Sequence, residues 1–127
     1  MLFRSIENCQ IGVFLALASA RGRTLIDREL YLPKRWCENQ DRLRAVDVPP
    51  DVRFATKPQL AQRMIERAWQ SGLHPRWVLG DEVYGSDGKT RRFLESHGQP
   101  YVLAVSSQQR LWNDCVQQRV EIGRAHV

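Results

Sequence analysis

Two segments near the N-terminal end of the chain predict a pair of strands. The segment 9–19, CQIGVFLALAS, is almost continuously apolar, which indicates a strand that is buried on both faces. The segment 24–32 alternates, so that Asp27, Glu29 and Tyr31 share one face of a second strand. A short turn that contains Gly22 separates the two segments, and together they predict a β-hairpin.

The pattern then changes from strands to an alternation of helices and strands. Pro33 ends the second strand, and residues 34–54 predict an irregular or partly helical connection. Residues 56–72 predict the clearest helix, with a capping box at Thr56 and Gln59, an apolar stripe, and Gly72 as its stop. Segments 76–81 and 101–106 predict strands, and 88–98 predicts a helix between them. This order predicts an α/β fold whose sheet has antiparallel and parallel parts.

Length and charge narrow the class of protein. A chain of 127 residues suits one compact domain. The net charge of +5 and the isoelectric point near 9.6 favour a polyanionic partner. Sixteen of the nineteen basic residues are arginines, whose planar fork matches phosphate oxygens. A GC-rich coding sequence explains the arginine content equally well.

The cysteines and the N-terminal segment bear on the compartment. Cys9, Cys37 and Cys115 form no Cys-x-x-Cys pair, which is typical of reduced thiols in a cytoplasmic protein. Arg4 and the following apolar run resemble a secretory leader ending at Ala20, but polar residues at positions 7, 8 and 10 interrupt it. The apolar run is also shorter than the roughly 20 residues that a membrane span needs. A buried strand is the preferred interpretation, and a cleaved leader is the alternative.

Asp81 is the candidate functional residue. It follows the predicted strand in WVLGDEVYG, and the carboxyl ends of parallel strands are where α/β folds gather functional groups. A carboxylate on a rigid strand suits Mg²⁺ or Mn²⁺. The alternative is that Asp81 only caps the next turn. Glu82 would point away from Asp81 if the strand continued, so it is a doubtful second ligand.

Other candidate motifs are weaker. GSDGKT ends like a phosphate-binding loop, but Val83 stands where that loop needs its first glycine. The three histidines, at 74, 97 and 126, have no metal-ligand spacing. Asp27 and Glu29 could flank a metal, although an exposed edge strand explains them more simply.

Four strings of the sequence resemble a known family. They are residues 6–36, FATKPQLAQRMIERA at 54–68, WVLGDEVYG at 77–85, and YVLAV at 101–105. The chain resembles the DDE transposases of bacterial insertion sequences, in particular insertion-sequence family 701. The resemblance implies a ribonuclease-H-like mixed sheet with flanking helices. It also implies three carboxylates that bind two Mg²⁺ or Mn²⁺ ions, and DNA as the partner.

The resemblance assigns a single catalytic residue in this chain. Asp81 matches the second carboxylate, as catalytic residue and metal ligand, and Tyr84 and Gly85 match the same string. We expect Tyr84 to pack and Gly85 to serve a turn. The first Asp is expected on a strand before IENCQ and the third carboxylate, a Glu, on a helix after YVLAV; Glu121 is not assigned to that role.

The ribonuclease-H-like fold is therefore expected to be incomplete here, without its first strand and its C-terminal catalytic helix. Residues 122–127, IGRAHV, match the translation of a common sequencing adapter, so residues 1–121 are interpreted as a transposase catalytic-domain fragment. We expect this fragment to be inactive by itself. The alternative is a small, basic, non-catalytic module that binds nucleic acid.

Overall fold

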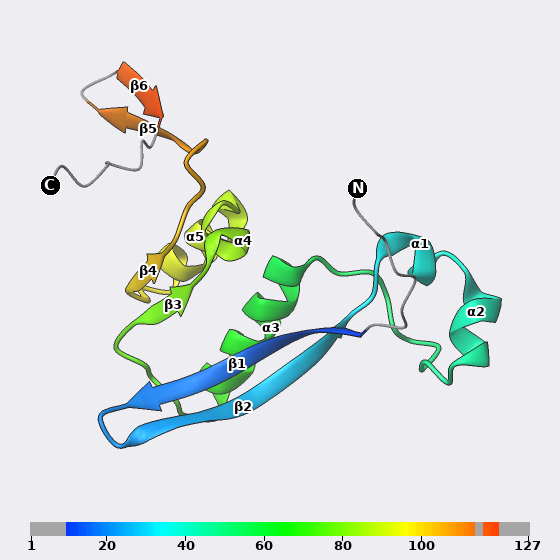
Figure 1. Ribbon diagram of the computed structural model, residues 1–127. Helices are drawn as coiled ribbons and strands as arrows, with labels where there is room; N and C mark the ends of the chain where they lie inside the picture. Colours follow the sequence, from blue (N-terminus) through cyan, green and yellow to red (C-terminus); the bar gives the residue numbers. More distant parts are fainter. Residues whose placement is uncertain (1–9, 114–115, 120–127) are drawn as a thin grey trace, which may run out of the picture. The chain divides into compact units, whose positions relative to one another are not determined.

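The chain forms two compact units in the computed structural model, which describes residues 10–113 and 116–119 (Figure 1). One unit is Met1–Gly72 and the other is Leu73–Val127. Length alone predicts a single compact domain. Each pair of described strands lies within one of the two units.

A β-hairpin is the framework of the first unit. Strand β1 (Ile11–Ser19) pairs antiparallel with β2 (Gly22–Tyr31), which confirms the predicted hairpin. Gly22 begins β2 with a φ of +138°, a backbone conformation that favours glycine. A bulge between Leu15 and Ala16 shifts the register, so that one half of the hairpin is rotated relative to the other.

Strand β1 is not buried on both faces, contrary to the expectation from its apolar run. Val13 is 3% exposed on the face that helix α3 covers, whereas Phe14, on the opposite face, is 60% exposed. A two-stranded sheet with one helix beside it can bury only one face. The continuous apolar run therefore predicted the strand correctly, but the prediction that both of its faces are buried was wrong.

Three helices follow the hairpin in this unit. The partly helical connection is confirmed by α1 (Lys34–Cys37) and α2 (Gln40–Ala45), whose Leu43 is buried. Helix α3 (Lys57–Gln70) has the predicted capping box: the Gln59 amide nitrogen donates to Thr56 Oγ1 over 3.3 Å, and the Thr56 amide nitrogen donates to Gln59 Oε1 over 2.8 Å. Its stripe buries Leu60, Met64 and Ile65.

Arg67 joins α3 to the hairpin. Its Nε donates to Asp27 Oδ2 over 2.9 Å, and its Nη2 donates to Glu29 Oε1 over 2.7 Å. The Asp27 and Glu29 carboxylates thus bind a guanidinium group, which neither the metal interpretation nor the edge-strand interpretation anticipated. The hydrogen bond from Arg67 lowers the pKa of Asp27, and the two carboxylates raise the pKa of Arg67.

The second unit contains a parallel pair of strands and two helices. Strand β3 (Val78–Gly80) pairs parallel with β4 (Tyr101–Leu103), and α4 (Glu82–Gly85) and α5 (Gly88–Ser96) lie between them in sequence. Leu94 and Thr90 of α5 are almost completely buried. Strands β5 (Arg110–Asn113) and β6 (Val116–Arg119) form an antiparallel pair that the sequence analysis did not predict.

The predicted fold class is confirmed in its coarse form. Antiparallel and parallel pairs and flanking helices are all present, but the described strands form separate two-stranded sheets. The continuous ribonuclease-H-like sheet stays a prediction. Among the described residues no helix has the length and apolar character needed to cross a membrane. Cys37 has a free thiol, and Cys9 and Cys115 lie outside the described residues.

The Arg67 ion pairs give a stability prediction. We expect Arg67→Gln to lower the free energy of unfolding by about 1 kcal/mol at neutral pH, because it leaves two adjacent carboxylates without their counter-charge. The folded-state pKa of Asp27 lies below its ordinary value of 3.8, so its stabilisation is present above that pH and is lost as the pH falls through the folded-state pKa.

Urea unfolding of both forms as a function of pH measures this effect. The difference in unfolding free energy should be present at pH 7 and should shrink below about pH 4. Arg63→Gln, on an exposed part of the same helix, is the matched control. A difference between the wild-type protein and Arg67→Gln that stays constant down to pH 2 would contradict the assignment.

Candidate functional site

Asp81 lies directly after β3, at the edge where both strands of the parallel pair end. Gly80 pairs with Leu103, and the Ala104 amide nitrogen donates to the Gly80 carbonyl oxygen over 3.0 Å. Because the two strands are parallel, their carboxyl ends meet at the same edge of the sheet. The predicted position of Asp81 at the carboxyl end of a parallel strand is therefore confirmed.

The Asp81 side chain caps helix α4. Its Oδ1 accepts a hydrogen bond from the Val83 amide nitrogen over 2.9 Å, and its carbonyl oxygen accepts from the Gly85 amide nitrogen over 3.0 Å. Capping was the structural alternative to a metal-ligand role, and the structure shows that the cap forms. A carboxylate has a second oxygen, and Asp81 is exposed, so the cap leaves that oxygen available to a further partner.

The strand ends at Gly80, so the condition under which Glu82 was expected to point away from Asp81 is not met. Glu82 is the first residue of α4, where a negative charge interacts favourably with the helix N-terminus. The relative direction of the Asp81 and Glu82 side chains is consequently set by a cap and a helical turn. The alternation of side chains along a strand does not apply here.

Gly85 is required by a close approach of two backbone segments. A Cβ atom on Gly85 would lie 1.8 Å from the Ala104 carbonyl oxygen, far inside contact distance. The expected turn requirement was wrong, because Gly85 is the last residue of α4 and its φ is not positive. Glycine lets α4 pack directly on the chain at the end of β4, and this contact fixes the helix that Asp81 caps.

Tyr84 packs beside the same strand end, as expected. Its side chain is half-buried, and its Cδ2 would lie 3.4 Å from a Cβ atom on Gly80. Burial raises the pKa of the Tyr84 phenol, and the negative charge of Asp81 raises it further. Tyr84 therefore stays protonated at neutral pH and serves as packing for the Asp81 segment.

The GSDGKT segment and Arg91, the residue after it, hold α4 and α5 in place. Asp87 caps α5 by accepting from the Thr90 amide nitrogen over 3.2 Å and from Thr90 Oγ1 over 2.7 Å. The Arg91 guanidinium group, from α5, donates to the Gly85 carbonyl oxygen at the end of α4. Sequence reasoning rejected a phosphate-binding loop here and missed these two roles. The capping spacing from Asp87 to Thr90 could have revealed the first of them.

The metal-ligand hypothesis for Asp81 depends on the chemistry of the side chains around it. Asp81 offers the hard, anionic oxygen that Mg²⁺ prefers, so its chemistry fits one ligand position. Within residues 10–113 and 116–119, however, no three His, Cys, Asp or Glu side chains come together as a metal-binding group. His97 packs on the Phe93 ring instead, and His126 and Glu121 lie outside the described residues.

The contact of Gly85 gives a second prediction. Gly85→Ala should lower the free energy of unfolding by about 2 kcal/mol or more, because the added methyl group meets a backbone carbonyl that cannot rotate away. Gly88→Ala is the matched control: its added carbon would meet only the ends of the flexible Arg91 and Arg92 side chains. Thermal unfolding followed by circular dichroism compares the two variants. Equal melting temperatures would contradict the requirement for glycine at 85.

Comparison with known proteins identifies a family for the chain. The family model described as DDE superfamily endonuclease matches residues 2–125, a range that includes most of both units. No curated protein and no solved structure matches the chain significantly. Since the family match extends over almost the whole sequence, the chain belongs to the DDE superfamily of endonucleases.

Proposed function

We propose that this chain is part of the catalytic domain of a DNA transposase from a bacterial insertion sequence of family 701. In this proposal the complete enzyme has a ribonuclease-H-like fold, works in the cytoplasm, and cleaves and joins DNA strands with Mg²⁺ or Mn²⁺. The observation that carries the proposal is the position of Asp81, a capped and exposed carboxylate at the carboxyl edge of a parallel strand pair. The family membership supports the endonuclease class.

We assign Asp81 the role of a metal ligand in this reaction. The bond from the Val83 amide holds one oxygen and orients the carboxylate, so the second oxygen points in a defined direction. Gly85 and Arg91 fix the helix to which this bond belongs. When bound, the metal supplies Lewis-acid activation of a phosphodiester and of the attacking oxygen. The contribution of this chain is to hold one carboxylate rigidly at the reaction centre.

One carboxylate does not make a two-metal site. Two-metal phosphoryl transfer requires ligands that fix both ions about 4 Å apart, and the described residues contain no group of three His, Cys, Asp or Glu side chains that could hold an ion. We therefore propose that the chain by itself binds metal weakly and does not cleave DNA. The other two carboxylates of the family triad have no assigned counterpart in this sequence.

A non-catalytic, basic nucleic-acid-binding module is the second candidate function. The net charge of +5 and the arginine content support it. The two candidates differ in what Asp81 does. A binding module should bind DNA with the same affinity in the presence and absence of Mg²⁺, and Asp81→Ala should leave that affinity unchanged.

The metal-ligand role of Asp81 can be tested without catalysis. Titration with Mn²⁺ should broaden the amide NMR signals of Val83 and its neighbours in the wild-type chain. Asp81→Asn should remove this broadening and keep the fold, because asparagine caps helices about as well as aspartate. Glu95→Gln, on α5, is the control for a general loss of negative charge. Equal broadening in the wild-type and Asp81→Asn chains would show that Asp81 is not the ligand.

The proposed inactivity of the chain alone is tested with supercoiled DNA. We expect no Mg²⁺-dependent nicking by the purified chain, because one metal ligand cannot position both ions. A nicking activity that requires Mg²⁺ and disappears in Asp81→Ala would overturn this expectation. A nicking activity that persists in Asp81→Ala would indicate a contaminating nuclease, and the expectation would stand.

A further inference from the structure

The register of the β1–β2 hairpin sorts its side chains onto two faces. Asp27 and Glu29 face α3, where Arg67 binds them. The opposite face carries the pairs Phe14 with Arg28, Ala16 with Leu25, and Ala18 with Arg23. We call these six residues the outer face of the hairpin. Helix α3 covers the other face, so the outer face is the one that a partner can reach.

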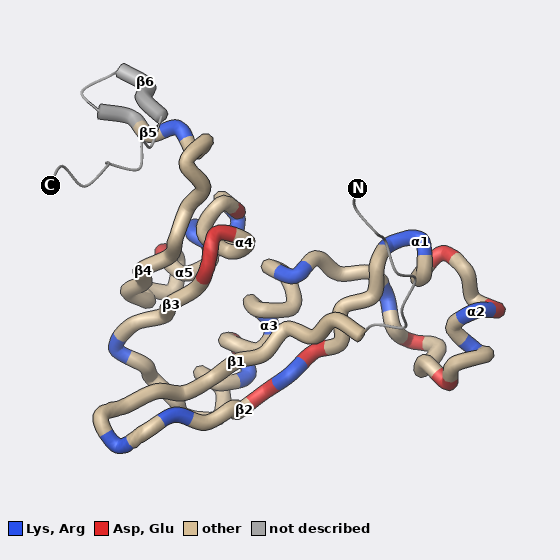
Figure 2. Tube along the Cα trace, in the orientation of Figure 1, with Lys and Arg blue, Asp and Glu red and all other residues tan. Residues whose placement is uncertain are grey.

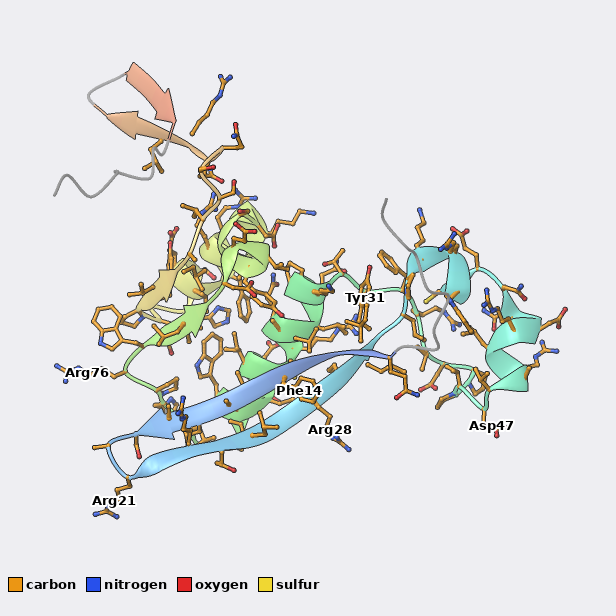
Figure 3. All side chains as sticks on the ribbon, in the orientation of Figure 1. Phe14, Arg21, Arg28, Tyr31, Asp47 and Arg76 are labelled. Carbon is orange, nitrogen blue, oxygen red and sulfur yellow. The ribbon has the colours of Figure 1, made fainter. Side chains whose placement is uncertain are left out.

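The two faces differ sharply in charge. Both carboxylates of the hairpin lie on the α3 side and are neutralised there by Arg67. Arg23 and Arg28 on the outer face, and Arg21 in the turn, form no salt bridge with a described residue. Figure 2 shows basic residues at the turn, and Figure 3 shows Arg21 and Arg28 pointing outward from the hairpin. The outer face therefore presents positive charge without any carboxylate.

Shape and exposure on this face suit a groove of duplex DNA. Phe14 is 60% and Leu25 is 66% exposed, and the small side chains of Ala16 and Ala18 keep the face shallow. The partners of Arg23 and Arg28 are Ala18 and Phe14. Ala18 and Phe14 are four residues apart on β1. At about 3.4 Å per residue, the two arginines opposite them are therefore roughly 14 Å apart, which is comparable with the major groove width of about 12 Å. A two-stranded ribbon is narrow enough to enter that groove.

A protein partner would cover the same apolar residues but would have to desolvate the arginines. A protein would need a carboxylate opposite each arginine to avoid burying an unpaired guanidinium group, whereas every nucleotide of a DNA duplex supplies a phosphate. The bulge beside Leu15 separates the half of the hairpin that carries Asp27 and Glu29 from the half that leads to the turn. Bulges increase the local twist of a ribbon, which helps it to follow a helical groove.

We propose that the outer face of the β1–β2 hairpin binds duplex DNA, with Arg21, Arg23 and Arg28 on phosphates and Phe14 against base edges in the major groove. This proposal rests on the proposed function in one respect, namely that the substrate is DNA. It assigns DNA binding to a surface that does not include Asp81. Binding through this face requires no metal.

Fluorescence anisotropy with a labelled 20-base-pair duplex tests the proposal on the full chain. Replacing Arg21, Arg23 and Arg28 together by Gln should weaken binding by about tenfold or more and lower the slope of log K against log salt by about 2 to 3. The matched control replaces Arg44, Arg53 and Arg76, which removes the same charge from exposed positions elsewhere. Circular dichroism verifies that both variants fold.

Phe14→Ser separates apolar contact from charge. It should weaken binding several-fold and leave the salt slope unchanged, because it removes no phosphate contact. Equal affinities for the hairpin triple variant and the control variant would overturn the proposal. It would also be overturned if Phe14→Ser abolished self-association in sedimentation while the arginine variants bound DNA normally, since the outer face would then be a protein interface.

The two proposals fail independently. A chain that binds no DNA but shows Mn²⁺ broadening at Val83 would overturn the hairpin surface and retain the metal role of Asp81. Hairpin-dependent DNA binding without any Mn²⁺ response would support the surface and reject Asp81 as a ligand.

Discussion

A two-stranded sheet with helices on one side can bury only one of its faces, and both units of this chain form under that constraint. In the first unit α3 covers Val13 and binds Asp27 and Glu29 through Arg67. In the second unit α4 and α5 accompany the β3–β4 pair, whose Leu79 and Val102 remain 73% and 60% exposed. The constraint leaves the outer face of the hairpin uncovered, and this is the surface to which we assign DNA binding.

Asp81 caps helix α4, and we propose that the same side chain also binds metal. Its bond to the Val83 amide is a structural cap, and a cap would explain an aspartate at this position by itself. The same bond restricts the side chain to one orientation. Metal sites require ligands whose orientation is fixed in this way. A structural role for Asp81 is therefore compatible with a catalytic one. The substitution Asp81→Asn separates the two roles, because asparagine keeps the cap and removes the charged ligand.

Local patterns in the sequence predicted the elements well. Thr56 and Gln59 form the expected capping box, Gly22 stands at the expected hairpin turn, and Asp81 follows a parallel strand. Interactions between distant residues were not predictable in the same way. Arg67 is 40 residues from Asp27, and no periodicity indicates that they pair. The contact of Gly85 with Ala104 depends on how α4 packs against the end of β4. The sequence therefore indicated that a glycine is needed at position 85, but not that the need comes from this contact.

The connection between β3 and β4 also affects the order in which the chain can fold. The strands of the hairpin are joined by a turn at residues 20–21, so their contacts are local and form at a small cost in chain entropy. Strand β3 must instead meet β4 across residues 81–100, which contain α4 and α5. We therefore expect Asp81 to reach its position late in folding, and a nascent chain to display the arginine hairpin before it presents the carboxylate.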